Sequence, residues 1–223
     1  MTKPTFDLSS YYDAVSFSYL MHKGQVRRDL NIPYWVHVSM VSATVAEWGG
    51  DEVQVMAALT HDVVEDTGIT AEGLCAVMGN EVAQVVDGLS GSKDKAVSWR
   101  YRKLMYITAF DIEAVDPRCY LVKLADSHGN IISFTNTMIR DGVCTAKADT
   151  INSYVALTHI CLQKLQMYGT PQQYRVARFN MERIFDRLKS IGLCDAELLN
   201  EINFDDSSVN WYTRLSDLWA ADN

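Results

Sequence analysis

Helix-breaking residues are rare in this chain, and they fall between its apolar segments. Its 223 residues include only four prolines, and apolar and polar residues seldom alternate for long. Proline removes a hydrogen bond from a helix interior, and period-two alternation marks a half-buried strand. The scarcity of both predicts an all-α fold whose helices are joined by short turns.

Glycine and proline divide the chain into helical segments, with breaks at 49–50, 141–142 and 169–171. The predicted helices span residues 9–23, 37–47, 51–66, 70–78, 80–88, 97–113, 117–139, 145–168 and 171–191, followed by one or two short acidic helices. The stretch 90–96 is predicted to be a loop. A soft boundary near residue 169 separates a main domain, 1–168, from a helical C-terminal extension, 169–223, that we expect to pack on it.

Composition narrows the class of protein. Hydrophobic residues make up 48% and charged residues 22%, which is typical of a globular domain. A net charge of −8 argues against a surface that binds nucleic acid, and no apolar run is long enough to cross a membrane. The N-terminus lacks a secretory pattern, and the cysteines are odd in number and widely spaced (Cys75, Cys119, Cys144, Cys161 and Cys194). We expect reduced thiols and a cytoplasmic protein.

The stretch LTHDVVEDTG, residues 59–68, concentrates His61, Asp62, Glu65 and Asp66 with no basic residue among them. On a helix over 51–66, these four side chains share one face, where like charges one turn apart repel. Two interpretations stay open. In the first, solvent and scattered lysines and arginines compensate the negative charge of the helix face. In the second, a divalent cation compensates this charge, since histidine and aspartate are natural ligands for such an ion.

Two residues elsewhere favour the cation. His37 begins a predicted helix, and Asp126 follows the apolar run YLVKLA, so its carboxylate is expected to project from a largely buried helix. A buried carboxylate without a partner is costly. A histidine, a later His-Asp pair and a distant aspartate together predict a metal site.

Four blocks resemble the hydrolase domain of the RelA/SpoT homologues, in the HD metal-dependent phosphohydrolase superfamily, and in particular the stand-alone small alarmone hydrolases. The blocks are MHKGQVRRDLNIPYWVH (21–37), AALTHDVVEDTGITAEGL (57–74), EVAQVVDGLS (81–90) and VKLADSHGN (122–130). The resemblance covers about residues 10–160. It implies an HD-domain helical bundle over residues 1–168 and an Mn²⁺ ion held by four ligands, His37, His61, Asp62 and Asp126.

The same resemblance implies roles for further residues. The Glu65-Asp66 pair lies beside the metal, and we assign Glu65 as the base that orients water and Asp66 as the acid that protonates the leaving group. The resemblance implies nucleotide contacts at Arg27 and Arg28, a further candidate contact at Tyr154, and for Asn130 either a contact with the ribose or a position behind the metal ligands. Lys23 joins Arg27 and Arg28 in a basic group that a polyphosphate substrate requires. Arg100, Arg102 and Lys103 form a second basic group, for which a solvated helix face and a phosphate contact are both open. Tyr34 is expected to pack the loop beneath His37, with base stacking as the alternative.

The implied activity is Mn²⁺-dependent hydrolysis of the 3′-diphosphate of (p)ppGpp or (p)ppApp, with release of pyrophosphate. The alternatives are an NADPH 2′-phosphatase, a general nucleotide phosphohydrolase and, in a different class, a non-catalytic module that binds nucleotide. Ser127-His128-Gly129 departs from the family's usual basic and bulky residues, so the exact substrate preference stays open, and the sequence does not rank guanine against adenine. The expected partner is a small nucleotide, with no nucleic acid and no membrane. A homo-oligomer and a functional pairing with an alarmone synthetase are left open.

Overall fold

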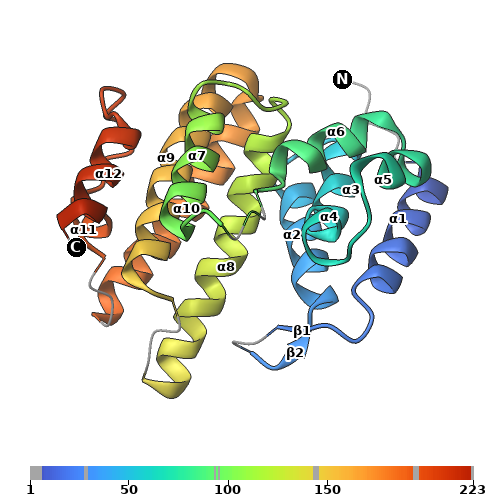
Figure 1. The fold of residues 1–223 in the computed structure, drawn as a ribbon, viewed down its shortest axis with the longest axis horizontal. Helices are drawn as coiled ribbons and strands as arrows, with labels where there is room; N and C mark the ends of the chain where they lie inside the picture. The colour runs from blue at the N-terminus through green and yellow to red at the C-terminus, as the bar shows by residue number, and fades with distance from the viewer. Residues whose placement is uncertain are drawn as a thin grey trace.

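The computed structural model describes residues 7–27, 30–92, 94, 96–142, 146–192 and 196–221. Helices account for nearly all of the regular structure in these ranges (Figure 1), which confirms the all-α prediction. The described strands are two residues each: β1 (Val26–Arg27) pairs antiparallel with β2 (Ile32–Pro33). This hairpin was not predicted, because two-residue strands show no alternation. No helix in the described ranges is long and apolar enough to span a membrane.

The N-terminal part of the chain forms a layer of helices around α3. The helices are α1 (Leu8–Met21), α2 (Trp35–Glu47), α3 (Glu52–Thr60), α4 (Val63–Asp66), α5 (Ala71–Met78) and α6 (Asn80–Leu89). Helix α3 packs against α1, α2 and α6. It begins with a capping box in which Asp51 and Gln54 each bond the other's backbone N–H, at 2.8 and 3.0 Å.

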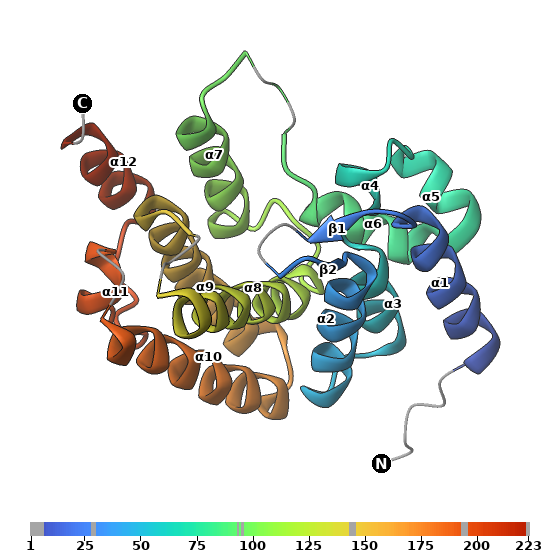
Figure 2. The same cartoon turned by 90° about the horizontal axis from the view of Figure 1, so that it is seen from below.

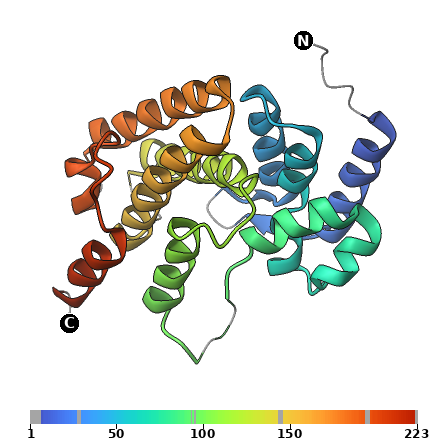
Figure 3. The same cartoon turned by 90° about the horizontal axis from the view of Figure 1, so that it is seen from above.

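The C-terminal part of the chain packs on the other side of one long central helix, α8 (Cys119–Asp141). The remaining helices are α7 (Trp99–Asp111), α9 (Ala148–Tyr168), α10 (Pro171–Ile191), α11 (Glu197–Glu201) and α12 (Trp211–Ala221). Helix α8 contacts α2 and α3 on one side and α9 and α10 on the other (Figure 2). Figure 3 shows α10 running along the outside of α8 and α9. The predicted division at residue 169 stays a prediction.

Helix α8 carries much of the core. Leu121, Val122, Leu124 and Ala125 are each at most 1% exposed. Burying a leucine or valine side chain stabilises a fold by about 1.5–3 kcal/mol, so this segment is firmly placed. Asp126 follows directly, which confirms that its carboxylate emerges from a buried helix.

The prediction of one helix over 51–66 is wrong in one respect. Helix α3 ends at Thr60, His61 and Asp62 form a turn, and the separate helix α4 begins at Val63. At Asp62 the backbone angles are φ −95° and ψ −4°, outside ideal helix geometry although the residue still accepts from the N–H of Asp66 at 2.8 Å. The break lies at the two residues that the sequence assigned to a metal.

Candidate metal centre and active site

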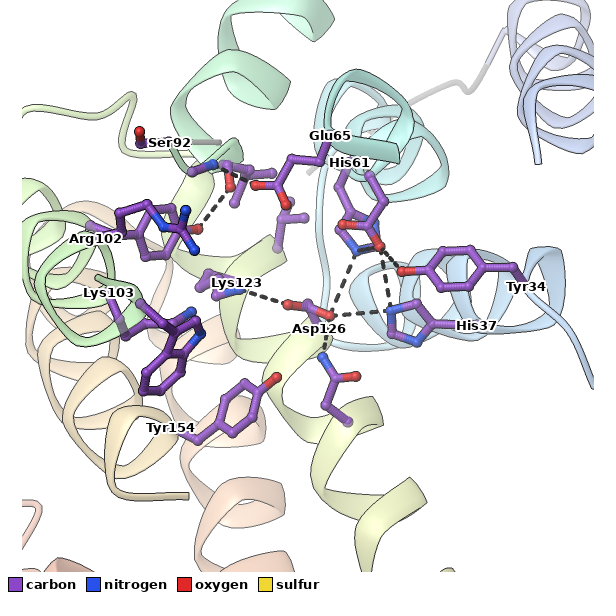
Figure 4. Close-up of a pocket in the computed structure, with 17 residues that line it drawn as sticks. Tyr34, His37, His61, Glu65, Ser92, Arg102, Lys103, Lys123, Asp126 and Tyr154 are labelled. Carbon is purple, nitrogen blue, oxygen red and sulfur yellow. Dashed lines mark hydrogen bonds and ion pairs between the residues drawn. The ribbon is translucent and has the colours of Figure 1, made fainter. Parts of the chain in front are cut away.

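Three predicted ligands converge from distant parts of the chain. His37 lies in the first turn of α2, His61 follows α3, and Asp126 lies on α8. All three are buried, and one ligand atom from each lies within 4.8 Å of the others. The Nε2 atoms of the two histidines lie 3.2 and 3.6 Å from Oδ1 of Asp126. Figure 4 shows the three side chains pointing toward one another.

The fourth predicted ligand, Asp62, adjoins this cluster. Its Oδ2 atom lies 3.0 Å from Nε2 of His61 and 3.8 Å from Nε2 of His37. The same oxygen accepts a 2.6 Å hydrogen bond from the hydroxyl of Tyr34. Burial and the nearby carboxylates raise the pKa of Tyr34, so its phenol keeps its proton and remains a donor. The sequence assigned Tyr34 to loop packing, because nothing local shows that its hydroxyl reaches Asp62.

The charge of Asp126 is compensated on α8 itself. Lys123 lies one turn earlier, and its Nζ is 2.7 Å from Oδ2 of Asp126. The amide of Asn130, one turn later, donates to Oδ1 at 2.7 Å. Burial opposes ionisation, but the ammonium of Lys123 holds the pKa of Asp126 well below its usual value. The carboxylate is therefore anionic and fixed in orientation.

The histidine geometry fits a divalent metal. Nδ1 of His61 lies 2.8 Å from the carbonyl oxygen of Ala58, so we place the ring proton on Nδ1. The lone pair of Nε2 then faces the cluster, and this buried atom has no hydrogen-bond partner among the described residues. Buried polar atoms without partners are rare in proteins, and imidazole with carboxylate is a donor set that divalent metals accept. The residues present fit such an ion.

A cavity of about 380 Å³ opens beside the cluster. Its lining combines the cluster with residues of α4, α7, α8 and α9 and of the segment after α6. The lining residues that the sequence had singled out are Tyr34, His37, His61, Asp62, Glu65, Arg102, Lys103, Asp126, Asn130 and Tyr154. A cavity whose wall carries a few convergent polar groups is the usual form of a site for a small molecule.

Comparison with known proteins agrees with this geometry. The HD-domain family profile matches residues 14–141, more than half of the chain. The chain belongs to the HD-domain family. The matched region includes both histidines and both aspartates of the cluster, and it ends with α8.

Sequence relatives of this HD domain confirm the resemblance to RelA/SpoT homologues. The chain is 31% identical over 166 residues to a GTP pyrophosphokinase of Myxococcus xanthus, covering 70% of this chain and 21% of the relative. It is 31% identical over 192 residues to a guanosine-3′,5′-bis(diphosphate) 3′-pyrophosphohydrolase of Vibrio cholerae, covering 76% and 26%. The chain thus spans about a fifth to a quarter of the length of these curated relatives.

A solved structure shares the fold of this HD domain. It is described as a metazoan ortholog of SpoT that hydrolyzes ppGpp and plays a role in starvation responses. The two superpose with a TM-score of 0.63 at 24% identity, covering 82% of this chain and 98% of that one. At this identity the comparison supports the HD-domain fold alone.

The two predicted catalytic carboxylates of the HD domain differ in position. Glu65 lines the cavity, where its Oε1 accepts a hydrogen bond from the backbone N–H of Gly91. Burial raises the pKa of Glu65, and the charge of Asp62 adds to the effect. Asp66 is exposed at the end of α4 and is not among the lining residues. The geometry therefore brings Glu65, and not Asp66, into the described cavity.

The predicted nucleotide contacts are also divided. Arg27, on β1, donates a 2.6 Å hydrogen bond to Oδ1 of Asn130, which joins the hairpin to the amide beside Asp126. Asn130 and Tyr154 line the cavity, whereas Lys23 is exposed and is not among the lining residues. Arg28 lies outside the described residues.

The basic residues of α7 are divided between two places. Arg102 and Lys103 line the cavity of the HD domain, while Arg100 bonds Asp149 on α9 instead. Burial, reinforced by the ammonium of Lys123, lowers the pKa of Lys103 to about 8. The sequence showed that these cations share a helix, but which of them face a ligand depends on how α7 packs.

Proposed function

We propose that this chain hydrolyses the 3′-diphosphate of an alarmone nucleotide, (p)ppGpp or (p)ppApp, and releases pyrophosphate. The observation that carries the proposal is the convergence of His37, His61 and Asp126 in the wall of a cavity that also presents cations. The names of the sequence relatives, which include guanosine-3′,5′-bis(diphosphate) 3′-pyrophosphohydrolases, support this substrate class.

The cofactor we propose is Mn²⁺, held by His37, His61, Asp62 and Asp126. Such an ion lowers the pKa of water and neutralises charge on phosphoryl oxygens. The chain's own residues orient the ligands. The carbonyl of Ala58 fixes the tautomer of His61, and Tyr34 fixes one oxygen of Asp62. Hydrogen-bonded partners of this kind are part of the design of a metal site, because they determine where each lone pair points.

Glu65 is the proposed base. Its carboxylate lines the same cavity, and the N–H of Gly91 holds one of its oxygens in place. A pKa raised by burial brings the carboxylate closer to neutral pH, where a general base works best. Asp66 stays our predicted leaving-group acid. Because Asp66 is exposed and outside the cavity lining, the proposed mechanism relies mainly on Glu65.

Substrate recognition is proposed to use residues of the cavity and one residue beside it. Asn130 and Tyr154 line the cavity and Arg27 bonds Asn130, so a guanidinium plane and a phenol ring are available for a nucleoside. Arg102 and Lys103 on α7 supply positive charge for the phosphates farther from the reacting bond. A chain of net charge −8 needs such a local group of cations to bind a polyphosphate. Lys23 and Arg28 stay predictions for additional contacts.

The test is turnover by the purified, manganese-loaded protein with ppGpp, ppApp, NADPH and simple mononucleotides. We expect pyrophosphate and the 5′-phosphorylated nucleoside from one or both tetraphosphates. Phosphate released from NADPH or from mononucleotides alone would replace the proposal with the phosphatase alternative. Binding of a tetraphosphate without turnover would indicate the non-catalytic module. His61→Ala is the inactive control.

A further inference from the structure

The half of α7 that faces the substrate cavity rests on the C-terminal helix α12. The two helices contact each other, and the rings of Trp99 and Trp219 lie 5.9 Å apart. Arg100 reaches the same place, because its Nη1 donates to the carbonyl oxygen of Trp219 at 2.8 Å. Its Nε donates to Asp149 of α9 at 2.9 Å. One turn of α7 is thus joined to α12 and to α9.

Helix α12 is itself firmly anchored. Trp211, Leu215 and Trp219 are at most 4% exposed and recur at four-residue spacing, so one face of α12 is buried. The indole N–H of Trp211 donates to Nδ1 of His159, a buried residue of α9, at 3.0 Å. Helix α12 is therefore a fixed support for α7.

The two ends of α7 are held by different neighbours. At the C-terminal end, the Phe110 ring packs on Tyr120 of α8 at 5.9 Å, and the Tyr106 hydroxyl donates to the carbonyl of Leu89 at 2.8 Å. At the N-terminal end, Trp99, Arg102 and Lys103 line the cavity, and Trp99 and Arg100 contact α12. The Arg102 side chain also donates to the carbonyl oxygen of Asp94 at 2.6 Å, but the turn of α7 that carries both cations rests on α12.

We infer that α12 is a positioning element for substrate: it holds α7 so that Arg102 and Lys103 meet the 5′-phosphates. Helix α12 lies outside the region matched by the HD-domain profile, residues 14–141. The inference deepens the proposed function and rests on it, since the phosphates belong to the proposed substrate. It concerns affinity and not chemistry, because no residue of α12 lines the cavity.

The central variant is Trp219→Ala, compared with Tyr212→Ala, an exposed position on the same helix. We expect Trp219→Ala to raise KM for the tetraphosphate on the order of tenfold and to change kcat by less than about twofold, the pattern of lost substrate binding. Tyr212→Ala and the conservative Trp219→Phe should leave KM near its wild-type value. A folded Trp219→Ala protein with wild-type KM, or with an equal loss in kcat, overturns the inference.

Two further measurements separate positioning from general damage. With a nucleoside 3′-diphosphate that has no 5′-phosphate, Trp219→Ala should show wild-type KM. In a protein that already carries Arg102→Ala and Lys103→Ala, the added Trp219→Ala substitution should raise KM by less than about twofold. The reason is that substitutions whose effects pass through the same groups are not additive. Additive effects, or an equal KM increase for both substrates, contradict a role through these cations.

Hydrogen exchange distinguishes this inference from the proposed function. In Trp219→Ala, amides of residues 99–104 should exchange faster while those of α8 stay protected, and Tyr212→Ala should change neither. If the wild-type protein hydrolyses no alarmone, the proposed function fails, and the exchange result still decides whether α12 holds α7. Unchanged exchange at residues 99–104 overturns the support by α12 even in an active enzyme.

Discussion

The ring of His61 shows how single contacts define the candidate centre. Its Nδ1 is occupied by the carbonyl of Ala58, and its Nε2 faces His37, Asp62 and Asp126. Neither the ring orientation nor the tautomer follows from the motif His-Asp. They follow from the carbonyl of Ala58, one turn earlier in α3, which holds Nδ1.

Removing the Asp62 carboxylate is expected to remove the metal. In Asp62→Ala, the two imidazoles lose the anion that lies 3.0 and 3.8 Å from them, and Tyr34 loses its acceptor. We expect loss of bound manganese and of nearly all activity, with a cooperative thermal transition retained. Metal analysis and a melting curve provide the measurement. His128→Gln is the matched control, since His128 packs on Trp48 and is not among the cavity's lining residues, and it should keep its manganese.

The Glu65→Gln substitution tests the base without disturbing the metal. Glutamine preserves the size of the side chain and can still accept from Gly91, but it cannot take a proton. We expect kcat to fall by about 10²–10⁴-fold, the usual contribution of a general base, while manganese content stays at the wild-type level. If kcat of Glu65→Gln stays within a few-fold of the wild-type value, Glu65 is not the base and another residue has that role.

Lys103 gives the substrate affinity a pH dependence. The protonated side chain of Lys103 attracts phosphate. Because its pKa is about 8, the side chain loses this positive charge as the pH rises through that value. Binding energy present at about pH 7 is therefore lost by about pH 9, where roughly one lysine in ten keeps its proton. We expect KM of wild type to rise by up to about tenfold over this range. Steady-state kinetics should show a flatter profile for Lys103→Arg, because a guanidinium stays charged.

At the level of elements, a hydrogen bond joins the segment after α6 to Glu65. Gly91 donates its backbone N–H to Glu65, and this contact counteracts the rise in the pKa of Glu65. Gly91→Pro removes the donor. We expect kcat to fall on the order of tenfold, as a reacting group loses its position. The control is Gly91→Ala, whose added Cβ would meet Glu65 and Tyr106 at ordinary distances of 3.5 and 3.6 Å. Equal kcat in both variants would show that this bond does not position Glu65.

Elements defined by local pattern were predictable, and those defined by distant contacts were not. The apolar run before Asp126 predicts a buried helix with a carboxylate at its edge, and α8 has this form. The orientation of α7 and the contact of Tyr34 with Asp62 arise from packing between segments far apart in the sequence. The β1–β2 hairpin and the break at 61–62 are local but too short to show in a residue pattern. Lys123 lies one turn before Asp126 on the predicted helix, so the spacing of these two residues was a signal that the sequence analysis missed.

For the whole molecule, the bound metal is expected to add stability. Its proposed ligands come from α2, from the turn after α3 and from α8, so an ion would join three parts of the fold. An ion present at 100 times its dissociation constant stabilises by about 2.7 kcal/mol, which in a chain of this size raises Tm by roughly 5–10 °C. Differential scanning fluorimetry with and without manganese measures the shift. Asp62→Ala should show none, and a shift of equal size in that variant would indicate binding elsewhere.

The cavity has two walls with separate supports. One wall carries His37, His61 and Glu65 and is formed by the N-terminal helices. The other wall carries Arg102 and Lys103 of α7, and α7 packs against α9 and α12. If the proposed function holds, we expect substitutions on the second wall to change which nucleotide is accepted and to leave the proposed metal ligands in place. When α7, α9 and α12 are exchanged together between two relatives, the chimeric protein should take the ligand preference of the donor of these helices. Its reaction should stay that of the protein that supplies the proposed metal ligands.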